Sequence, residues 1–411
     1  MRILWIKTSP LHPLTRGGDL RTFHLLRWLI RWHEVTFAGM VADSGQETAA
    51  EKHLEYSRFA VWTQEPQASL QMSLPRFLMG AAFNLFSAMP YAAARFESAI
   101  WRERIRQLLR EQKFDLLVCD FLFPAVSLPW DDKVRSAIPW VIFQHNVESM
   151  IWLRRAENKR GLTSAYWRSQ WRRMERHEAE MCSRFDGIVA VSEEDASIFR
   201  ERFGLKNVIG TAPTGVDLEF FQSIPREPTS VPTAVFVGSM DWYANVDAVL
   251  YFVRDVWPEV RQRIPKARFL IVGRQPPPEI LSLHTLDKGV EVTGTVPDVR
   301  PYMRQAQLMV VPLRIGGGTR LKIYEAMAAE LPVVSTTIGA EGLPVSHGRH
   351  LLIADDAETL AKEVVRLMSN PDLADTLRQN ALNEVAGARS WEAAARVFEC
   401  ACRGLLKEAR Q

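Results

Sequence analysis

The chain has 411 residues, of which 47% are hydrophobic and 24% charged, and its formal net charge is +3. This length supports two or three domains, each large enough to bury a core of its own. The net charge is too small to indicate a nucleic-acid-binding protein, and no nucleic-acid-binding module is recognisable. The four cysteines have neither CxxC nor metal-ligand spacing: Cys119, Cys182, Cys400 and Cys402. This spacing disfavours a disulfide framework and a zinc site, and a reducing compartment fits.

The amino-terminal run MRILWIKTSP is too short for a signal peptide and is broken by Lys7 and Pro10. No stretch reaches 18 uninterrupted apolar residues, so we expect no membrane-spanning helix. The sequence therefore predicts a cytoplasmic protein that starts folding at residue 2.

Short apolar runs alternate with longer helical patterns along the whole chain. In the first half, the expected strands are residues 2–6, 34–39, 59–62, 115–119, 140–144 and 187–191. In the second half, they are residues 234–238, 268–272, 290–294, 308–312 and 332–336. Continuous apolar strands separated by helices indicate parallel sheets covered on both faces. The fold class is α/β, and the number of strands predicts two doubly wound domains.

The best domain boundary lies in FFQSIPREPTSVPTA, where three prolines interrupt the pattern. We expect an amino-terminal domain over 1–226, a second domain over 227–388, and a terminal helical segment over 389–411. Each domain begins with a strand, a glycine-containing turn and a helix. Ligands of open parallel sheets bind beyond the carboxyl ends of the strands, so two such domains would face each other across a cleft.

The segment 151–185 combines nine basic residues with four acidic ones, and Trp152, Trp167 and Trp171 are interleaved. Two interpretations remain open. Basic helices with aromatic residues lie on anionic membrane surfaces. Solvated helices whose tryptophans pack against a sheet show the same composition.

A triple glycine, Gly316 to Gly318, lies after the expected strand 308–312 and before a helix that should start near Thr319. Free backbone N–H groups and a helix amino terminus form a site for phosphate, and Arg320 and Lys322 add positive charge. Glu325 lies six residues past Thr319, about 9 Å along a helix. That distance suits a carboxylate that accepts hydrogen bonds from the hydroxyls of a ribose. The loop thus predicts a site for a nucleoside diphosphate; an ordinary loop before a salt-bridged helix is the alternative.

The residues VTGTVPDVRPYMRQAQLMVVPLRIGGGTRLKIYEAMAAELPVVSTTIGAEGL resemble the donor-binding half of family 4 glycosyltransferases, which have the two-domain GT-B fold. The stretches RGGDLRTFHLL, FQHNVES, AVSEEDASIFR, PTGVDLEFF, LIVGR and SWEAAARVFE extend the resemblance along most of the chain. It looks closest to bacterial enzymes that build exopolysaccharides. The resemblance implies a nucleotide-sugar donor, a glycan or lipid-linked acceptor, and retention of the anomeric configuration. It also implies that the terminal helix over 389–411 crosses back onto the amino-terminal domain.

The resemblance also implies roles for single residues. Glu325 matches the second Glu of the family's Glu-x7-Glu motif, which holds the ribose. Gly17 and Gly18 match the loop over the diphosphate, and Thr295 and Val296 match the segment that contacts the base. His145, at the end of the strand 140–144, matches a His that points at the transferred sugar; a structural hydrogen bond is the alternative for it.

Two departures from the family pattern stand out. Gly317 occupies the position of the first Glu of the motif, which in the family contacts the donor sugar. The turn after strand 234–238, which contains Gly238 and Ser239, lacks the usual Arg and Lys. Arg320 and Lys322 are the natural replacements, and with His145 they form the expected catalytic set.

Transfer breaks the bond that joins an anomeric carbon to a phosphate, so negative charge develops on the leaving diphosphate. The helix N–H groups, Arg320 and Lys322 would stabilise it without a metal or other cofactor. No Asp-x-Asp metal motif is present. Two alternatives share the fold: a nucleotide-sugar-binding protein without turnover, and a nucleotide-sugar epimerase. A NAD-dependent oxidoreductase is disfavoured, because no GxGxxG follows the first strand of either domain.

Overall fold

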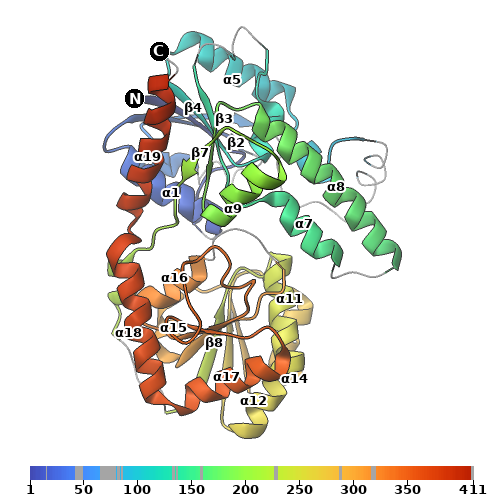
Figure 1. The fold of residues 1–411 in the computed structure, drawn as a ribbon, viewed down its shortest axis with the longest axis vertical. Helices are drawn as coiled ribbons and strands as arrows, with labels where there is room; N and C mark the ends of the chain where they lie inside the picture. Colours follow the sequence, from blue (N-terminus) through green and yellow to red (C-terminus); the bar gives the residue numbers. More distant parts are fainter. Residues whose placement is uncertain are drawn as a thin grey trace. The chain divides into compact units, whose positions relative to one another are not determined.

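The computed structural model describes residues 1–14, 16–41, 50–64, 80, 84, 87–131, 135, 138–157, 161–225, 230–286, 289–315 and 321–408. The chain divides into two compact units (Figure 1). One comprises Met1–Pro213 together with Ala394–Gln411, and the other comprises Thr214–Ala393. The chain thus returns to its first unit within the last helix, whereas the sequence analysis places its boundaries at 226/227 and 388/389.

The described part of the first unit contains a seven-stranded sheet in the order β3-β2-β1-β4-β5-β6-β7, and every neighbouring pair is parallel. Its strands are β1 (Arg2–Ile6), β2 (Glu34–Val41), β3 (Phe59–Gln64), β4 (Leu116–Asp120), β5 (Trp140–Phe143), β6 (Gly187–Ala190) and β7 (Val208–Thr211). Because β1 lies next to β4 rather than β3, the sheet is doubly wound, and the strand order reverses beside β1.

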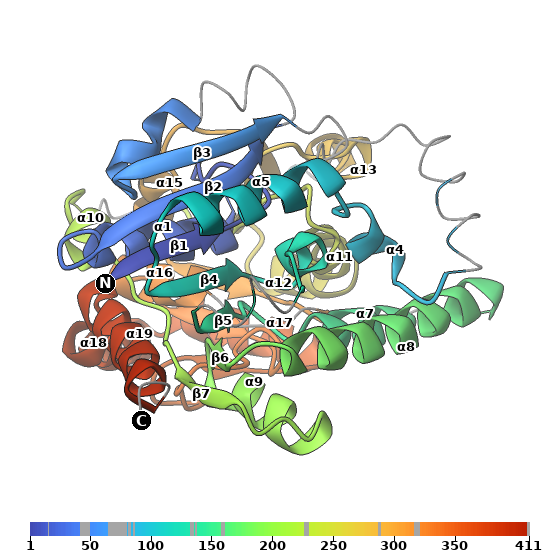
Figure 2. The same cartoon turned by 90° about the horizontal axis from the view of Figure 1, so that it is seen from above.

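Alternate residues along these strands enter two separate cores. Leu4 and Ile6 pack with residues of the helices Ala99–Glu111 and Gly161–Ser183, whereas Ile3 and Trp5 pack with residues of the helices Gly17–Leu29 and Trp391–Glu408. Figure 2 shows helices on both faces of this sheet. The helices of the unit are α1 (Gly17–Leu29), η1 (Glu51–Glu55), α4 (Tyr91–Ala94), α5 (Ala99–Glu111), η3 (Phe123–Ser127), α7 (Glu148–Glu157), α8 (Gly161–Ser183), α9 (Glu193–Ser197), η4 (Ile198–Arg202) and α19 (Trp391–Glu408).

The described part of the second unit contains a six-stranded parallel sheet in the order β10-β9-β8-β11-β12-β13. Its strands are β8 (Thr233–Val237), β9 (Arg268–Val272), β10 (Val290–Gly294), β11 (Leu308–Val311), β12 (Val333–Ser335) and β13 (Leu352–Ile353). The helices are α10 (Leu218–Gln222), α11 (Tyr243–Tyr251), η5 (Phe252–Val256), α12 (Trp257–Arg263), α13 (Pro278–Leu281), α14 (Leu283–Leu286), α15 (Arg300–Gln305), α16 (Leu321–Ala328), α17 (Ala357–Ser369) and α18 (Pro371–Ala388).

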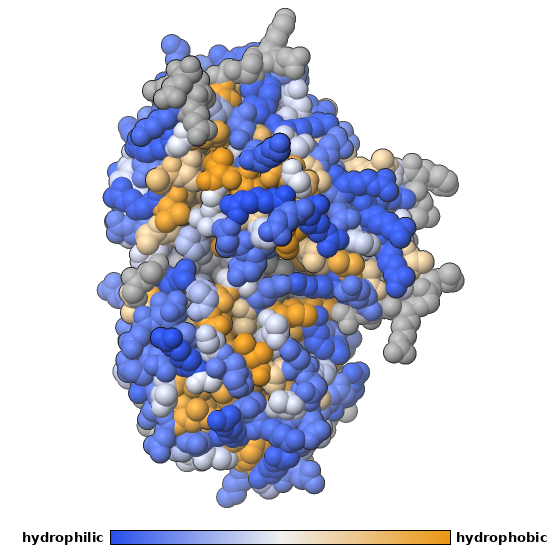
Figure 3. Space-filling model, in the orientation of Figure 1, coloured by the Kyte–Doolittle hydropathy of each residue, from blue (hydrophilic) through white to orange (hydrophobic). Residues whose placement is uncertain are grey.

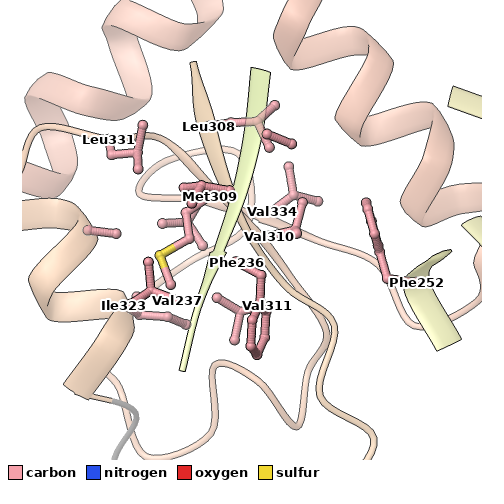
Figure 4. Close-up of a cluster of buried hydrophobic side chains, with 14 of the residues drawn as sticks. Phe236, Val237, Phe252, Leu308, Met309, Val310, Val311, Ile323, Leu331 and Val334 are labelled. Atoms are coloured by element: carbon pink, nitrogen blue, oxygen red, sulfur yellow. The ribbon is translucent and has the colours of Figure 1, made fainter. Parts of the chain in front are cut away.

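One continuous core holds the second unit together, and Figure 4 shows its centre. Phe236 of β8 and Val310 of β11 are fully buried there, as is Ile323 of α16. The apolar side chain of Ile323 fixes the first turns of α16 on the sheet. This packing determines where the neighbouring polar residues of α16 lie.

The eleven predicted strands are confirmed, with ends that differ by one or two residues. Two further strands, β7 and β13, were not predicted, and both lie at sheet edges. The predicted α/β class, with two doubly wound parallel sheets, is confirmed. No helix in the described part of the chain is long and apolar enough to cross a membrane.

Candidate functional site

Three charged or titratable side chains of the first unit meet beyond the carboxyl ends of adjacent strands. Lys7 follows β1, Asp120 ends β4, and His145 lies two residues after the end of β5. His145 Nε2 lies 2.7 Å from Asp120 Oδ1, and Lys7 Nζ lies 3.2 Å from the same oxygen. The His145 contact has the length of a hydrogen bond but not its alignment. All three residues are buried.

Two residues on the α1 side of the sheet contact the second oxygen of Asp120. Trp5 Nε1 donates to Asp120 Oδ2 at 2.8 Å, and Thr22 Oγ1 lies 2.7 Å from the same atom. Lys7 also lies 3.6 Å from Asp19 Oδ1. The carboxylate therefore joins three strands and helix α1 in one buried polar network.

The charges of this network shift its pKa values strongly. Burial by itself raises the pKa of Asp120, but the ammonium of Lys7 and the imidazole of His145 outweigh it, so the pKa lies well below its usual range. Burial lowers the pKa of His145 to about 4, against the opposing effect of Asp120. At neutral pH the network thus contains an ionised Asp120 and a neutral imidazole. Because Nε2 faces the carboxylate, we assign the ring proton to Nε2, which leaves Nδ1 as an acceptor.

Two of the predicted site residues meet here. Gly17 and Gly18 form the first turn of α1, and a methyl group on Gly18 would lie 3.2 Å from His145 Nδ1. The glycine thus leaves room for the accepting nitrogen of the imidazole. Both alternatives for His145 find support, because the ring has a structural partner in Asp120 and a second nitrogen that faces the glycine turn.

A second group of polar residues surrounds the turn after β8 in the second unit. Lys322 Nζ donates to Asn245 Oδ1 at 2.9 Å, and Asn245 Nδ2 donates to the backbone oxygen of Ser239 at 2.7 Å. A methyl group on Gly238 would lie 2.8 Å from Lys322 Nζ. The structure therefore brings Gly238, Ser239 and Lys322 together, as the sequence analysis expects of residues that bind one diphosphate.

The same turn receives a second cation that the sequence analysis did not single out. Arg274 follows β9 and donates from Nε to Ser239 Oγ at 2.7 Å, and from Nη2 to Asp241 Oδ2 at 2.7 Å. Its signal was present in LIVGR, where an arginine follows the carboxyl end of an apolar strand. The first-unit residues Lys7 and Asp120 carry the same kind of signal and were also missed.

Glu325 lies on α16, three residues after Lys322, so the two side chains share one side of the helix. Burial raises the pKa of Glu325 to about 7, although Lys322 acts in the opposite direction. Within the described residues, no hydrogen bond to its carboxylate is observed. A half-buried carboxylate without a protein donor can accept hydrogen bonds from the hydroxyls of a ligand.

The remaining predicted residues are placed only in part. Thr295 and Val296 follow β10, the edge strand next to β9, and Thr295 is exposed. Gly316, Gly317, Gly318, Thr319 and Arg320 lie outside the described residues, and α16 begins at Leu321. Among the described residues, no cluster of three or more His, Cys, Asp and Glu side chains could hold a metal ion.

The basic segment 151–185 covers most of α7 and all of α8, two helices that pack side by side and extend beyond the sheet (Figures 1 and 2). Its tryptophans are half-buried. The ring centroids of Trp152 and Trp167 lie 5.4 Å apart, and the guanidinium of Arg155 lies 3.8 Å from the centroid of Trp167. The aromatic residues therefore stabilise the helix pair rather than form an exposed apolar face.

Comparison with known proteins places this arrangement in a family. The model of Glycosyltransferase Family 4 matches residues 16–220, and the model of Glycosyl transferases group 1 matches residues 231–370. Together they cover most of both units. The chain belongs to glycosyltransferase family 4.

Individual relatives agree with this assignment. A phosphatidyl-myo-inositol mannosyltransferase of Mycobacterium leprae is 27% identical over 76% of this chain and 79% of its own length. An uncharacterized 44.6 kDa protein in the cps region of Klebsiella pneumoniae is 20% identical over 66% of this chain and 69% of its own. The sucrose-phosphate synthase of Thermosynechococcus elongatus has a TM-score of 0.71 at 17% identity, with 99% of this chain and 100% of that chain covered. The family 4 chain is thus a glycosyltransferase with the GT-B fold.

Proposed function

We propose that this glycosyltransferase moves a sugar from a nucleoside diphosphate sugar to a glycan or lipid-linked acceptor, without a metal and with retention of the anomeric configuration. The observation that carries the proposal is the position of Lys322. Its ammonium lies at the turn of Gly238 and Ser239, and Glu325 follows one helical turn later. Phosphate at the ammonium and ribose at the carboxylate would place a nucleoside diphosphate along α16.

The chemistry requires charge stabilisation rather than a protein nucleophile. The bond from the anomeric carbon to the diphosphate oxygen breaks, the acceptor oxygen bonds to the same face of that carbon, and the acceptor proton passes to the leaving phosphate. Lys322 would stabilise the charge that develops on this phosphate. His145, held by Asp120, is the proposed contact to the transferred sugar, and as a neutral ring it would donate or accept a hydrogen bond without adding charge.

We place the reaction in cell-surface polysaccharide synthesis at the cytoplasmic side of the membrane. The Klebsiella pneumoniae relative, by its cps-region origin, supports this role, and the Mycobacterium leprae relative supports a lipid-linked acceptor. Neither relative identifies the sugar or the base used by this chain.

A peripheral contact with the anionic inner membrane face completes the proposal, and α8 carries the support for it. Three exposed arginines, Arg168, Arg172 and Arg176, recur every four residues along one side of this helix, and within the described residues none has an ionic partner. Hydrophilic residues cover this part of the surface in Figure 3. Like charges at this spacing destabilise a helix slightly, and contact with an anionic surface would relieve that repulsion.

The acidic residues of α8 do not provide that counter-charge. Glu175 pairs with Arg202 at 2.6 Å, and Glu180 pairs with Arg184 at 2.7 Å. Glu178 is buried and accepts from the backbone N–H groups that begin α7. A bilayer of anionic phospholipid offers phosphates at any spacing, so a straight row of arginines could contact it without a pocket.

A donor screen tests the proposed function. UDP, GDP and ADP are first compared by thermal shift, because a ligand that binds only the folded state raises the melting temperature. The matching nucleotide sugars are then incubated with glycan and lipid-linked acceptors, and the products are analysed by mass spectrometry. Transfer supports the proposal; donor conversion without an acceptor would indicate an epimerase, and tight binding without turnover a non-catalytic protein. Glu325→Ala should weaken the binding of the selected diphosphate, and unchanged affinity would remove Glu325 from the ribose role.

A further inference from the structure

The backbone fixes Arg274 beside the turn that follows β8. The N–H of Met240 donates to the backbone oxygen of Arg274 at 3.0 Å, which joins the two segments just past the strands. At the preceding residue, a methyl group on Gly273 would fall 1.8 Å from the backbone oxygen of Gly238. This approach therefore requires glycine at position 273, and it brings the arginine to the glycine and serine of the turn.

The side chain of Arg274 forms a closed triangle with two residues of that turn. Arg274 donates hydrogen bonds to Ser239 Oγ and Asp241 Oδ2. Ser239 Oγ in turn lies 2.6 Å from Asp241 Oδ1. The side chains of Arg274 and Asp241 are 17% and 31% exposed. The ion pair thus lies at the surface of the unit, where an anionic ligand can reach it.

Arg274 and Lys322 approach Ser239 from different directions. The guanidinium contacts its hydroxyl, while the ammonium reaches its backbone oxygen through Asn245. Two cations within two hydrogen bonds of one residue provide separate partners for the two phosphates of a diphosphate. A guanidinium can also bind two oxygens of one phosphate at once, and two of the Arg274 nitrogens, Nε and Nη2, already face polar partners at this turn.

We propose that Arg274 is a phosphate-binding residue of the donor site and that Asp241 occupies its guanidinium until a nucleoside diphosphate takes its place. The inference rests on the proposed function, since it assigns a residue to the same donor. It supplies the turn with the second cation that its own sequence lacks. It also gives Asp241 a defined effect: the carboxylate competes with the phosphate and so lowers the affinity of the site.

A purely structural ion pair would behave differently from a competing one. If Arg274 and Asp241 only brace the turn, the loss of either side chain disturbs the turn, and both losses weaken ligand binding. If Asp241 competes with the phosphate, its loss frees the guanidinium and strengthens binding. The two substitutions then have opposite signs.

Calorimetric titration of the full chain with UDP, GDP and ADP tests this inference. Arg274→Met should weaken the binding of the preferred diphosphate by about 10- to 100-fold, the usual range for a charge-assisted hydrogen bond, and leave the affinity for the corresponding nucleoside unchanged. Arg274→Lys should retain part of the affinity, because it keeps the charge and loses the bidentate geometry. Asp241→Asn should strengthen diphosphate binding several-fold.

Arg254→Met is the matched control, because Arg254 forms an exposed ion pair with Asp255 in the same unit. It should leave both affinities unchanged. Thermal unfolding of each variant checks that the fold is retained. Unchanged diphosphate affinity in Arg274→Met, or equal weakening in Arg274→Met and Asp241→Asn, would overturn the inference alone. Wild-type protein that binds none of the three diphosphates would overturn the proposed function as well.

Discussion

His145 and Asp120 form a buried pair in which His145 Nε2 lies 2.7 Å from Asp120 Oδ1. The two residues come from adjacent strands, β5 and β4, and a third strand adds Lys7 to the same oxygen. The carboxylate therefore has two tasks: it compensates a buried ammonium, and it sets the orientation of the imidazole. The second task determines which ring nitrogen is available to a ligand.

Asp120→Asn should destabilise the fold much more than the loss of a carboxylate from a surface ion pair. Among the residues that the structure describes, the substitution leaves the buried Lys7 with Asp19 as its only carboxylate partner, at 3.6 Å, so the free energy of unfolding should fall by about 3–5 kcal/mol. Asp115→Asn is the control, because Asp115 pairs with Arg2 at the surface, where a pair contributes about 0–1 kcal/mol. Urea unfolding measures both changes. Equal, small losses would contradict a central role for Asp120.

Glu325→Gln should have opposite effects on stability and on binding. The pKa of Glu325 is raised to about 7 in the folded state from an ordinary value of 4.5, so the folded chain favours the protonated form. The unfolded chain loses that proton first, and the resulting destabilisation grows from about pH 4.5 to about pH 7 and is constant above. The glutamine variant lacks this cost. At pH 8 its free energy of unfolding should exceed that of the wild type by on the order of 1 kcal/mol, and at pH 4 the two proteins should be equally stable.

Nucleotide binding should show the matching pH dependence. A ribose needs the ionised carboxylate as its acceptor, so diphosphate affinity of the wild type should fall as the pH drops from 8 to 6, and the affinity of Glu325→Gln should be low throughout. Calorimetry at the two pH values measures this. A glutamine variant that binds as tightly as wild type at pH 8 would show that Glu325 does not contact the ligand.

Gly238→Ala should displace the ammonium of Lys322. The added methyl group would lie 2.8 Å from Lys322 Nζ and 2.8 Å from Asn245 Nδ2, and the flexible end of the lysine is the group that moves. We expect roughly 10-fold weaker diphosphate binding, in proportion to one lost charge-assisted contact, with nearly wild-type stability. Gly404→Ala, where a methyl group meets nothing within 4 Å, is the control. Full diphosphate affinity in Gly238→Ala would argue against phosphate binding at this ammonium.

Much of the fold follows from the sequence because buried parallel strands are continuous apolar runs. The two missed strands lack that signal: β7 contains Gly210 and is only half-buried, and β13 has two residues. The site could be predicted less fully. Gly18 and His145 were each predicted as site residues, but the role of Asp120 depends on β4 lying next to both β1 and β5. Strand order, and the direction in which Lys322 extends from α16, are set by packing that no local pattern reports.

Substitution of the arginine row on α8 should weaken membrane binding strongly. We expect Arg168→Ser, Arg172→Ser and Arg176→Ser together to weaken binding to phosphatidylglycerol-containing vesicles roughly 100-fold, since each arginine near an anionic surface contributes about 1 kcal/mol. The control triple variant removes Arg184, Arg200 and Arg202, which are already paired with acidic residues in the structure. Because these charges are compensated, their loss should change vesicle binding little. Sedimentation with vesicles at low and high salt measures both variants, and equal losses would indicate that net charge alone, rather than the unpaired row, governs the contact.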